Sequence, residues 1–260
     1  IRSLSVTATS VEGARNGITV LSESDTPSAH INGGFITISA SGLVKGVAGD
    51  GIYADNSATL GAGGGMNIDV AEVSGGRHGI LALTNGLVIG NLINGALTIT
   101  TRGSVTGFSG DGIHAEHAGD AEISINAQAA VSGGAAGIYA LHTGAGATTI
   151  NATGPIQGGT YGVRAENNNN NSGDLKVNVA NVTGGTGVSL VSASRTGVIN
   201  VVASGPVVGT TGDGINTYNR FDIRSLSVTA TSVEGARNGI TVLSESETPS
   251  AHINGGFITI

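Results

Sequence analysis

The chain has 260 residues, of which 45 are Gly, while aromatic residues make up 3% and charged residues 11%. So much Gly without a Gly-X-Y period excludes collagen, the many Ile and Val exclude a disordered chain, and the scarcity of aromatic residues argues against an ordinary globular core. A net charge of −7 without a basic cluster argues against nucleic acid as a partner, the absence of Cys excludes disulfides and thiol chemistry, and no apolar run is long enough to span a membrane.

A long repeat organises the chain. Residues 1–38 return as residues 223–260 with one change, from Asp25 to Glu247. The period is therefore 223 minus 1, or 222 residues. Such near-identity is typical of a tandem array. We predict that residues 1–222 form one complete repeat unit, that residues 223–260 begin the next within one continuous solenoid, and that further copies lie outside these residues.

A shorter period lies inside the long one. Nine of the Gly-Ile and Gly-Val pairs along the chain recur at spacings between 25 and 34 residues. The eight intervals indicate about eight coils per 222-residue repeat. We expect the apolar residues after these Gly to stack from coil to coil as a structural ladder. In the first eight coils they are Ile18, Ile52, Ile80, Ile113, Ile138, Val163, Val188 and Ile215.

Each coil carries three short apolar segments. The first alternates, as in Leu4 and Val6, the second is a single residue such as Val11 before a Gly-rich bend, and the third follows the Gly, as in Ile18 and Val20. Alternation over a few residues is the signature of a β-strand, and the abundant Gly and missing 3.6-residue period exclude a helical solenoid. We predict an all-β fold, a right-handed parallel β-helix, because crossovers between parallel strands are nearly always right-handed.

The residues between the inward positions of the third segment are expected to face outward. They show no common chemistry, which is typical of a solvated surface column. They are Thr19, Tyr53, Leu81, His114, Tyr139, Arg164, Ser189 and Asn216.

The column directly before the recurring Gly holds the candidate site. Asp50, His78 and Asp111 occupy it in three successive coils, so His78 is expected to lie about 5 Å from each carboxylate. Such a group could hold a metal, or serve as acid and base on a polysaccharide. The simpler interpretation is that Asp before Gly is a turn residue bonded to its own backbone. We therefore expect no catalytic, cofactor or metal site, and name these three residues as the candidates for one.

Calcium is the cofactor with some support, since Asp50, Asp111 and Asp213 each stand in a Gly-Asp-Gly sequence. The repeated nonapeptide of calcium-loaded β-rolls is absent, and the three Asp do not fall in consecutive coils. We expect no cofactor, with structural calcium as the open alternative. Long insertions at residues 22–34 and 84–95 are expected to form binding loops on one edge of the rod or, in the second case, an extra strand.

Three sequences carry a family resemblance: GDGIYA at residues 49–54, GDGIHA at 110–115 and SGGAAGIYA at 132–140. They resemble the passenger domains of bacterial autotransporter and filamentous-haemagglutinin-like surface proteins. The resemblance implies export to the bacterial cell surface, an extracellular β-helical rod, and a role in adhesion or biofilm formation. The long near-identical repeat departs from a passenger with one functional head, and is more similar to a giant repetitive adhesin or stalk.

The sequence favours a structural and adhesive repeat of a secreted, cell-surface fibre over an enzyme. Its expected partners are the adjacent repeats of the same chain and a host or bacterial surface ligand, either glycan or protein, or a second copy of itself. Two alternatives stay open: a polysaccharide lyase or glycoside hydrolase on a β-helix, and an inert spacer. An enzyme would need a single site, whereas tandem units multiply any site they contain.

Overall fold

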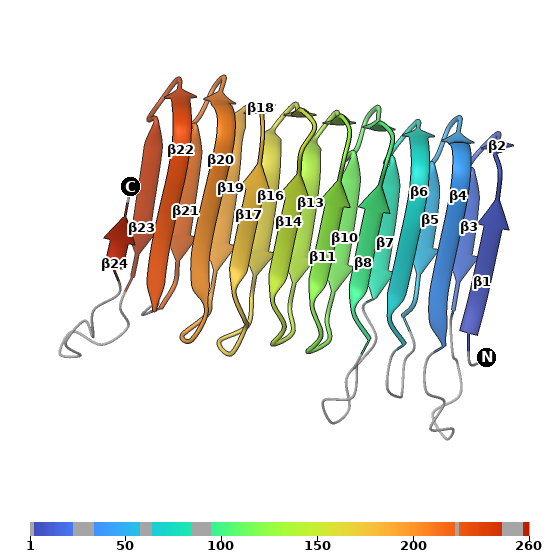
Figure 1. Ribbon diagram of the computed structural model, residues 1–260, viewed down its shortest axis with the longest axis horizontal. Helices are drawn as coiled ribbons and strands as arrows, with labels where there is room; N and C mark the ends of the chain where they lie inside the picture. The colour runs from blue at the N-terminus through green and yellow to red at the C-terminus, as the bar shows by residue number, and fades with distance from the viewer. Residues whose placement is uncertain are drawn as a thin grey trace.

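The computed structural model describes residues 3–22, 34–57, 64–84, 95–221, 224–245 and 257–259. These residues form 24 strands, and none of them is helical. Every pair of hydrogen-bonded strands is parallel, and the strands stack as an elongated solenoid with the two chain ends at opposite ends of the rod (Figure 1). The fold is the predicted parallel β-helix.

One face of the rod is a nine-stranded sheet to which each coil contributes its third strand. Its strands, in chain order, are β3 (Ile18–Leu21), β5 (Ile52–Asp55), β7 (Ile80–Thr84), β10 (Ile113–His117), β13 (Ala136–His142), β16 (Tyr161–Asn167), β19 (Thr186–Ser192), β21 (Ile215–Asn219) and β23 (Ile240–Ser244). The eight steps from β3 to β23 correspond to the eight intervals of the sequence period.

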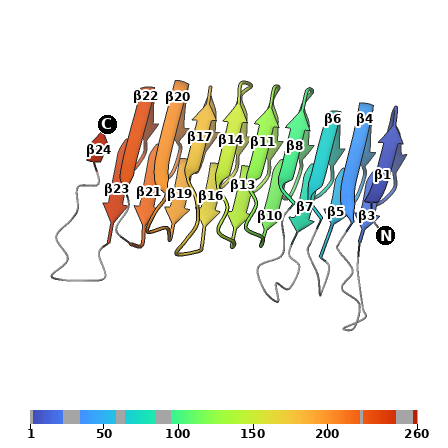
Figure 2. The same ribbon diagram turned by 60° about the horizontal axis from the view of Figure 1, so that its bottom comes forward.

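A 15-stranded sheet forms the other two faces (Figure 2). The strands of its first face are β1 (Ser3–Ala8), β4 (Phe35–Gly46), β6 (Met66–Gly75), β8 (Leu97–Thr101), β11 (Ile123–Ala127), β14 (Thr148–Ala152), β17 (Leu175–Val179), β20 (Val198–Gly209), β22 (Ser225–Gly235) and β24 (Phe257–Thr259). The short strands of its second face are β2 (Val11–Gly13), β9 (Val105–Gly107), β12 (Val131–Gly133), β15 (Ile156–Gly158) and β18 (Val182–Gly184). The long strands β4, β6, β20 and β22 continue from the first face into the second, with a register shift at the bend of β4 between Ala40 and Leu43.

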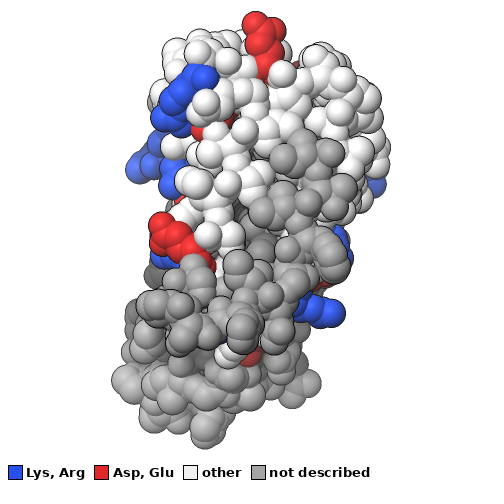
Figure 3. All heavy atoms as spheres, turned by 90° about the vertical axis from the view of Figure 1, so that its left-hand side faces the viewer, with Lys and Arg blue, Asp and Glu red and all other residues white. Residues whose placement is uncertain are grey.

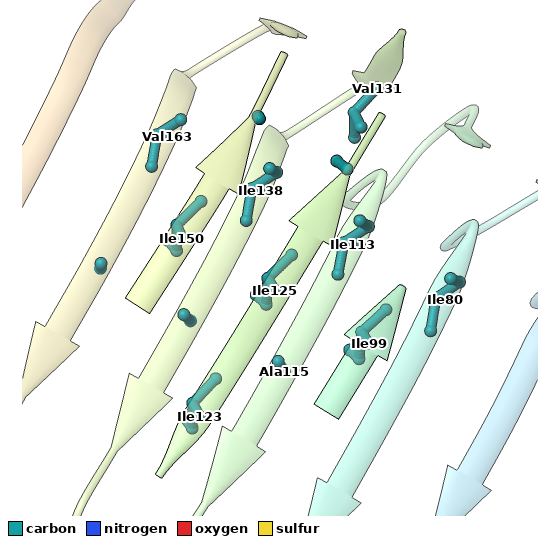
Figure 4. Packing of buried hydrophobic residues seen from close by; sticks show 14 of the residues in the cluster. Ile80, Ile99, Ile113, Ala115, Ile123, Ile125, Val131, Ile138, Ile150 and Val163 are labelled. Atoms are coloured by element: carbon teal, nitrogen blue, oxygen red, sulfur yellow. The ribbon is translucent and has the colours of Figure 1, made fainter. Parts of the chain in front are cut away.

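The core runs along the axis of the rod. Ile113 is paired in register with Ile80 on one side and with Ile138 on the other, and all three side chains are fully buried. Figure 4 shows this row facing Ile99 and Ile125 of the 15-stranded sheet. The other members of the expected ladder are also in register and at most 6% exposed; they are Ile18, Ile52, Val163, Val188 and Ile215. Each buried side chain contributes about 1.5–3 kcal/mol through removal of apolar surface from water.

The recurring Gly lies where neighbouring coils approach most closely. A Cβ atom on Gly112 would lie 2.6 Å from the carbonyl oxygen of Gly137 and 2.7 Å from Cγ1 of Val131, both in the next coil. Gly79 meets an equivalent pair of atoms in its own neighbouring coil. Gly therefore recurs once per coil because any side chain at this position would clash with the next coil.

We expect Gly112→Ala to destabilise the rod by about 2 kcal/mol, because the added methyl group must push the next coil away. Urea unfolding followed by circular dichroism should show a lower midpoint. Gly239→Ala is the matched control, since among the residues that the structure describes a Cβ atom there would meet nothing closer than the carbonyl oxygen of Val233 at 3.7 Å. An unchanged midpoint for Gly112→Ala would contradict this account of the period.

Candidate functional site

The column before the recurring Gly ties each coil to the next through side chains. The Asn16 side-chain oxygen accepts the backbone N–H of Asp50 at 2.9 Å, and Asp50 Oδ1 accepts that of His78 at 3.1 Å. His78 Nδ1 accepts the N–H of Asp111 at 2.9 Å, and Asp111 Oδ1 accepts that of Ala136 at 2.8 Å. The prediction that these groups bond to their own turn was wrong. Instead, each of these side chains accepts a backbone N–H of the next coil.

Asp50 is paired with Arg77 and is therefore not available to the candidate site formed with His78 and Asp111. Arg77 donates from Nε to Oδ1 at 2.9 Å and from Nη2 to Oδ2 at 2.5 Å, and the Asp50 side chain is only 1% exposed. Burial opposes ionisation of this carboxyl, but the bonds from Arg77 and from the N–H of His78 outweigh it and lower the pKa of Asp50. Both oxygens are therefore engaged in a bidentate ion pair. Asp213 and Arg237 repeat this arrangement.

His114 takes the place expected for Asp50. Its Nδ1 lies 2.6 Å from Asp111 Oδ2, and its Nε2 lies 2.9 Å from Glu116 Oε1. Burial would lower the pKa of His114, but the two carboxylates outweigh burial and raise that pKa to about 9. The ring is therefore cationic at neutral pH and donates to a carboxylate on each side.

His78 has the opposite character. Burial is the main reason that its pKa is lowered, although Asp111 acts in the other direction. The ring is neutral at pH 7, and its Nδ1 is an acceptor because the N–H of Asp111 points at it. Asp111 Oδ2 lies 3.8 Å from this Nδ1. The structure thus brings His78 and Asp111 together, as expected, but with His114 as their third member.

A row of rings and one guanidinium crosses four coils on the nine-stranded sheet. The His78 and His114 rings are 5.3 Å apart and the His114 and Tyr139 rings 4.8 Å apart, both edge to face. The Arg164 guanidinium lies 5.6 Å from the centre of the Tyr139 ring and 4.9 Å from that of Tyr161. Edge-to-face ring pairs and contacts between a guanidinium and an aromatic ring both stabilise a folded chain. We call this row, together with Asp111, Glu116 and Glu166, the polar strip.

The polar strip corrects the expectation that the outward column lacks a common chemistry. The column contains no regular sequence pattern, but three of its members, His114, Tyr139 and Arg164, contact each other from coil to coil. Its members are also less solvated than expected: the His114 side chain is 16% exposed, and Leu81 and Ser189 are buried. Arg164 is held in place by Glu166, whose Oε1 accepts from Nε at 2.6 Å.

Two hollows lie on the same face of the rod. One of about 260 Å³ is lined by Asp111, Tyr139, Tyr161 and Arg164, together with the small residues between them. The second, of about 900 Å³, lies over the first three coils. Its lining residues are Arg15, Asn16, Thr19, Leu21, Ala48, Gly49, Tyr53 and Arg77. Figure 3 shows the end of the rod that carries the last coil, where several Lys, Arg, Asp and Glu side chains lie along its edges.

A second polar column lies inside the rod, and the sequence reasoning missed it. His117 and His142 are both fully buried, with ring centres 5.1 Å apart. His117 Nδ1 contacts the hydroxyl of Thr84, and His142 Nε2 lies 2.7 Å from the carbonyl oxygen of Gly119. Burial lowers the pKa of His117 to about 4 and also lowers that of His142. Both rings are therefore neutral at pH 7.

A regular signal marks this interior column. The residue four places after each ladder residue is polar in every coil. These residues are Ser22, Asn56, Thr84, His117, His142, Asn167, Ser192, Asn219 and Ser244, and all except Ser22 and Ser244 in the two end coils are buried.

The predicted loops fall mostly outside the described residues, because residues 23–33 and 85–94 are not among them. Within the ranges that the structure does describe, no helix is long and apolar enough to cross a membrane. No protein-family model, curated protein or solved structure matches this chain. A β-helix supports many functions, so function has to be argued from the polar strip.

Proposed function

We propose that this chain is a structural and adhesive repeat of an extracellular, cell-surface fibre, and that it binds its partner through the polar strip. The observation that carries the proposal is that rings, one guanidinium and carboxylates contact one another over four coils on one face of the rod. Partly exposed groups of these kinds, gathered on a rigid support, are typical of recognition surfaces.

The chemistry of the strip favours a polar partner such as a surface glycan. Tyr139 and Tyr161 present aromatic rings beside the hollow, and Arg164 and Asp111 supply a donor and an acceptor at its wall. Sugars present both apolar ring faces and hydroxyl groups, so aromatic and charged groups side by side suit them. Nucleic acid is disfavoured by the net charge of −7.

Tandem repetition would strengthen such binding. A unit of 222 residues carries one polar strip, so a fibre of several units carries several strips along one rigid axis. Simultaneous binding of several sites can raise the overall affinity by a factor of about 10²–10⁴ without any new contact. A weak site in each repeat is therefore sufficient for adhesion.

The test is retention of the purified chain on a panel of glycans, matrix proteins, whole cells and immobilised copies of itself. We expect saturable binding to one class, and at least a tenfold loss of affinity in the double variant Tyr139→Ser, Arg164→Ala. The matched control removes two charges away from the polar strip, by Lys176→Ala in β17 and by Arg102→Ala directly after β8, and should bind like the parent chain. Equal loss in both variants would count against the polar strip.

The two alternatives predict different outcomes of the same panel. A polysaccharide lyase or hydrolase would shorten one of the glycans, which is detected as new reducing ends. An inert spacer would be retained by nothing on the panel, and the adhesive proposal would then be wrong for this repeat.

A further inference from the structure

Three side chains of the polar strip form a group with the composition of a metal site. His78, Asp111 and His114 each offer one ligand atom, and these atoms lie within 4.8 Å of one another. The three side chains are 17%, 10% and 16% exposed, so an ion can reach them while most of its surroundings are protein. We propose that His78, Asp111 and His114 bind a divalent transition-metal ion of the zinc class.

The ligand types select the class of metal. Two imidazoles and one carboxylate are typical ligands of Zn²⁺ and its neighbours in the first transition row. Calcium instead requires six to eight oxygen ligands, and this group offers one carboxylate. The proposed ion therefore differs from the structural calcium that the Gly-Asp-Gly sequences suggested, and Asp50 takes no part in binding it.

The surrounding bonds already orient two of the ligands. Asp111 Oδ1 accepts the N–H of Ala136 at 2.8 Å, which leaves Oδ2 directed toward the two imidazoles. Glu116 Oε1 holds His114 Nε2 at 2.9 Å, which leaves Nδ1 as the ligand atom. A carboxylate on the far nitrogen of a ligating His is the usual outer partner of a metal-bound imidazole, and it fixes the ring orientation.

Binding exchanges one proton for the metal ion. His114 Nδ1 carries a proton toward Asp111 Oδ2 at 2.6 Å, and the ion takes the position of that proton while the proton is released to solvent. The two atoms must separate to about 3.3 Å to become neighbouring ligands of one tetrahedral ion with bonds of about 2.0–2.1 Å. His78 Nδ1 exchanges its bond from the N–H of Asp111 for a bond to the ion.

The test is calorimetric titration of the tag-free chain with Zn²⁺ after removal of metals by a chelator. We expect one site per 222-residue unit, release of about one proton measured in two buffers of different ionisation enthalpy, and no heat with Ca²⁺. His114→Gln and Asp111→Asn should abolish binding, and Glu116→Gln should weaken it by about 10–100-fold. Asp213→Asn removes a carboxylate from the same column in a distant coil, and should leave the affinity unchanged.

A measurement on the unmodified chain keeps the proposal testable if a variant fails to fold. X-ray absorption of the Zn²⁺-loaded protein should show two imidazole ligands and oxygen ligands at about 2.0–2.1 Å. Absence of heat with Zn²⁺, fewer than two imidazoles in the absorption spectrum, or full affinity in a folded His114→Gln chain would each overturn the proposal. Because these readouts do not involve an adhesive partner, they succeed or fail independently of the proposed function.

Discussion

Ile113→Asp should destroy the order of the coils around it. The side chain is fully buried between Ile80 and Ile138, so the substitution removes about 1.5–3 kcal/mol of apolar burial. It also places an unpaired carboxylate where no water reaches it, which adds at least several kcal/mol. The total exceeds most single-residue effects and is comparable to the whole stability of many domains. Circular dichroism and the thermal midpoint measure the loss.

Two variants separate burial from general intolerance of substitution. Asn126→Asp places the same carboxylate on an exposed position of β11. It should leave the free energy of unfolding within about 0.5 kcal/mol of the value for the parent chain. Ile113→Val keeps the site apolar and should cost about 0.5–1.5 kcal/mol. An Ile113→Asp chain with the parent spectrum and midpoint would show that this side chain does not face the core.

The stability of the rod should fall as the pH decreases from about 6.5 to 4. The pKa of His117 is about 4 in the folded chain because the ring is buried, against about 6.5 in the unfolded chain. Between these values the unfolded chain binds the extra proton, so acid favours unfolding. The stability is fully present above pH 6.5, and about 3 kcal/mol of it is lost as the pH approaches 4. Urea midpoints at pH 7.5 and 4.5 measure this.

His117→Thr identifies the group responsible. Thr occupies the equivalent place in the preceding coil at Thr84, so the substitution suits the site. The variant should lose less stability than the parent chain between pH 7.5 and 4.5, with the remainder due to His142 and His78, whose pKa values are also lowered. The same pH dependence in both chains would mean that His117 is not the group that resists protonation.

Other titrating groups act outside this pH window. The carboxyls of Asp50 and Asp111 have pKa values below the ordinary 3.8, so their contribution is lost only in stronger acid. His114 has a raised pKa of about 9, so its contribution is present below pH 6.5 and is lost as the pH rises toward 9. The loss of stability between pH 6.5 and 4 therefore belongs to the interior histidines and to His78, whose pKa is also lowered by burial.

The stacking of the coils could be predicted from the sequence because it depends on residue type alone. A ladder residue such as Ile113 pairs with the same kind of residue one coil away on either side. The spacing of these residues in the sequence therefore equals the length of one coil. The Gly112 position follows the same rule, since the approach of the next coil excludes a side chain there.

The polar strip could not be predicted in the same way. Alternation shows that His114 and Tyr139 face outward, but it does not show that their rings lean toward each other along the rod. It also does not show that Arg77, the residue next to His78, forms the ion pair with Asp50 in place of the His78 ring. These outcomes depend on side-chain lengths and rotamers, which the period does not encode.

The interior polar column has a sequence signal that lies at polar positions and not at the apolar ones. His117 and His142 stand four residues after their ladder residues, on the inward side of the alternation. A polar residue at the same place in successive coils indicates hydrogen bonds between neighbouring coils. The contact between the Thr84 hydroxyl and His117 Nδ1 is one of them. Comparison of polar positions between coils would have revealed it.

The central claim is that each repeat adds eight coils to one continuous rod and so adds one polar strip at a fixed distance from the last. The most direct test is the length, by electron microscopy, of chains that carry two, three and four copies of residues 1–222. Eight strand spacings predict an increase of about 38 Å for each added copy, without a visible joint. Separate beads, an increase far from this value, or a bend at each junction would contradict a continuous solenoid.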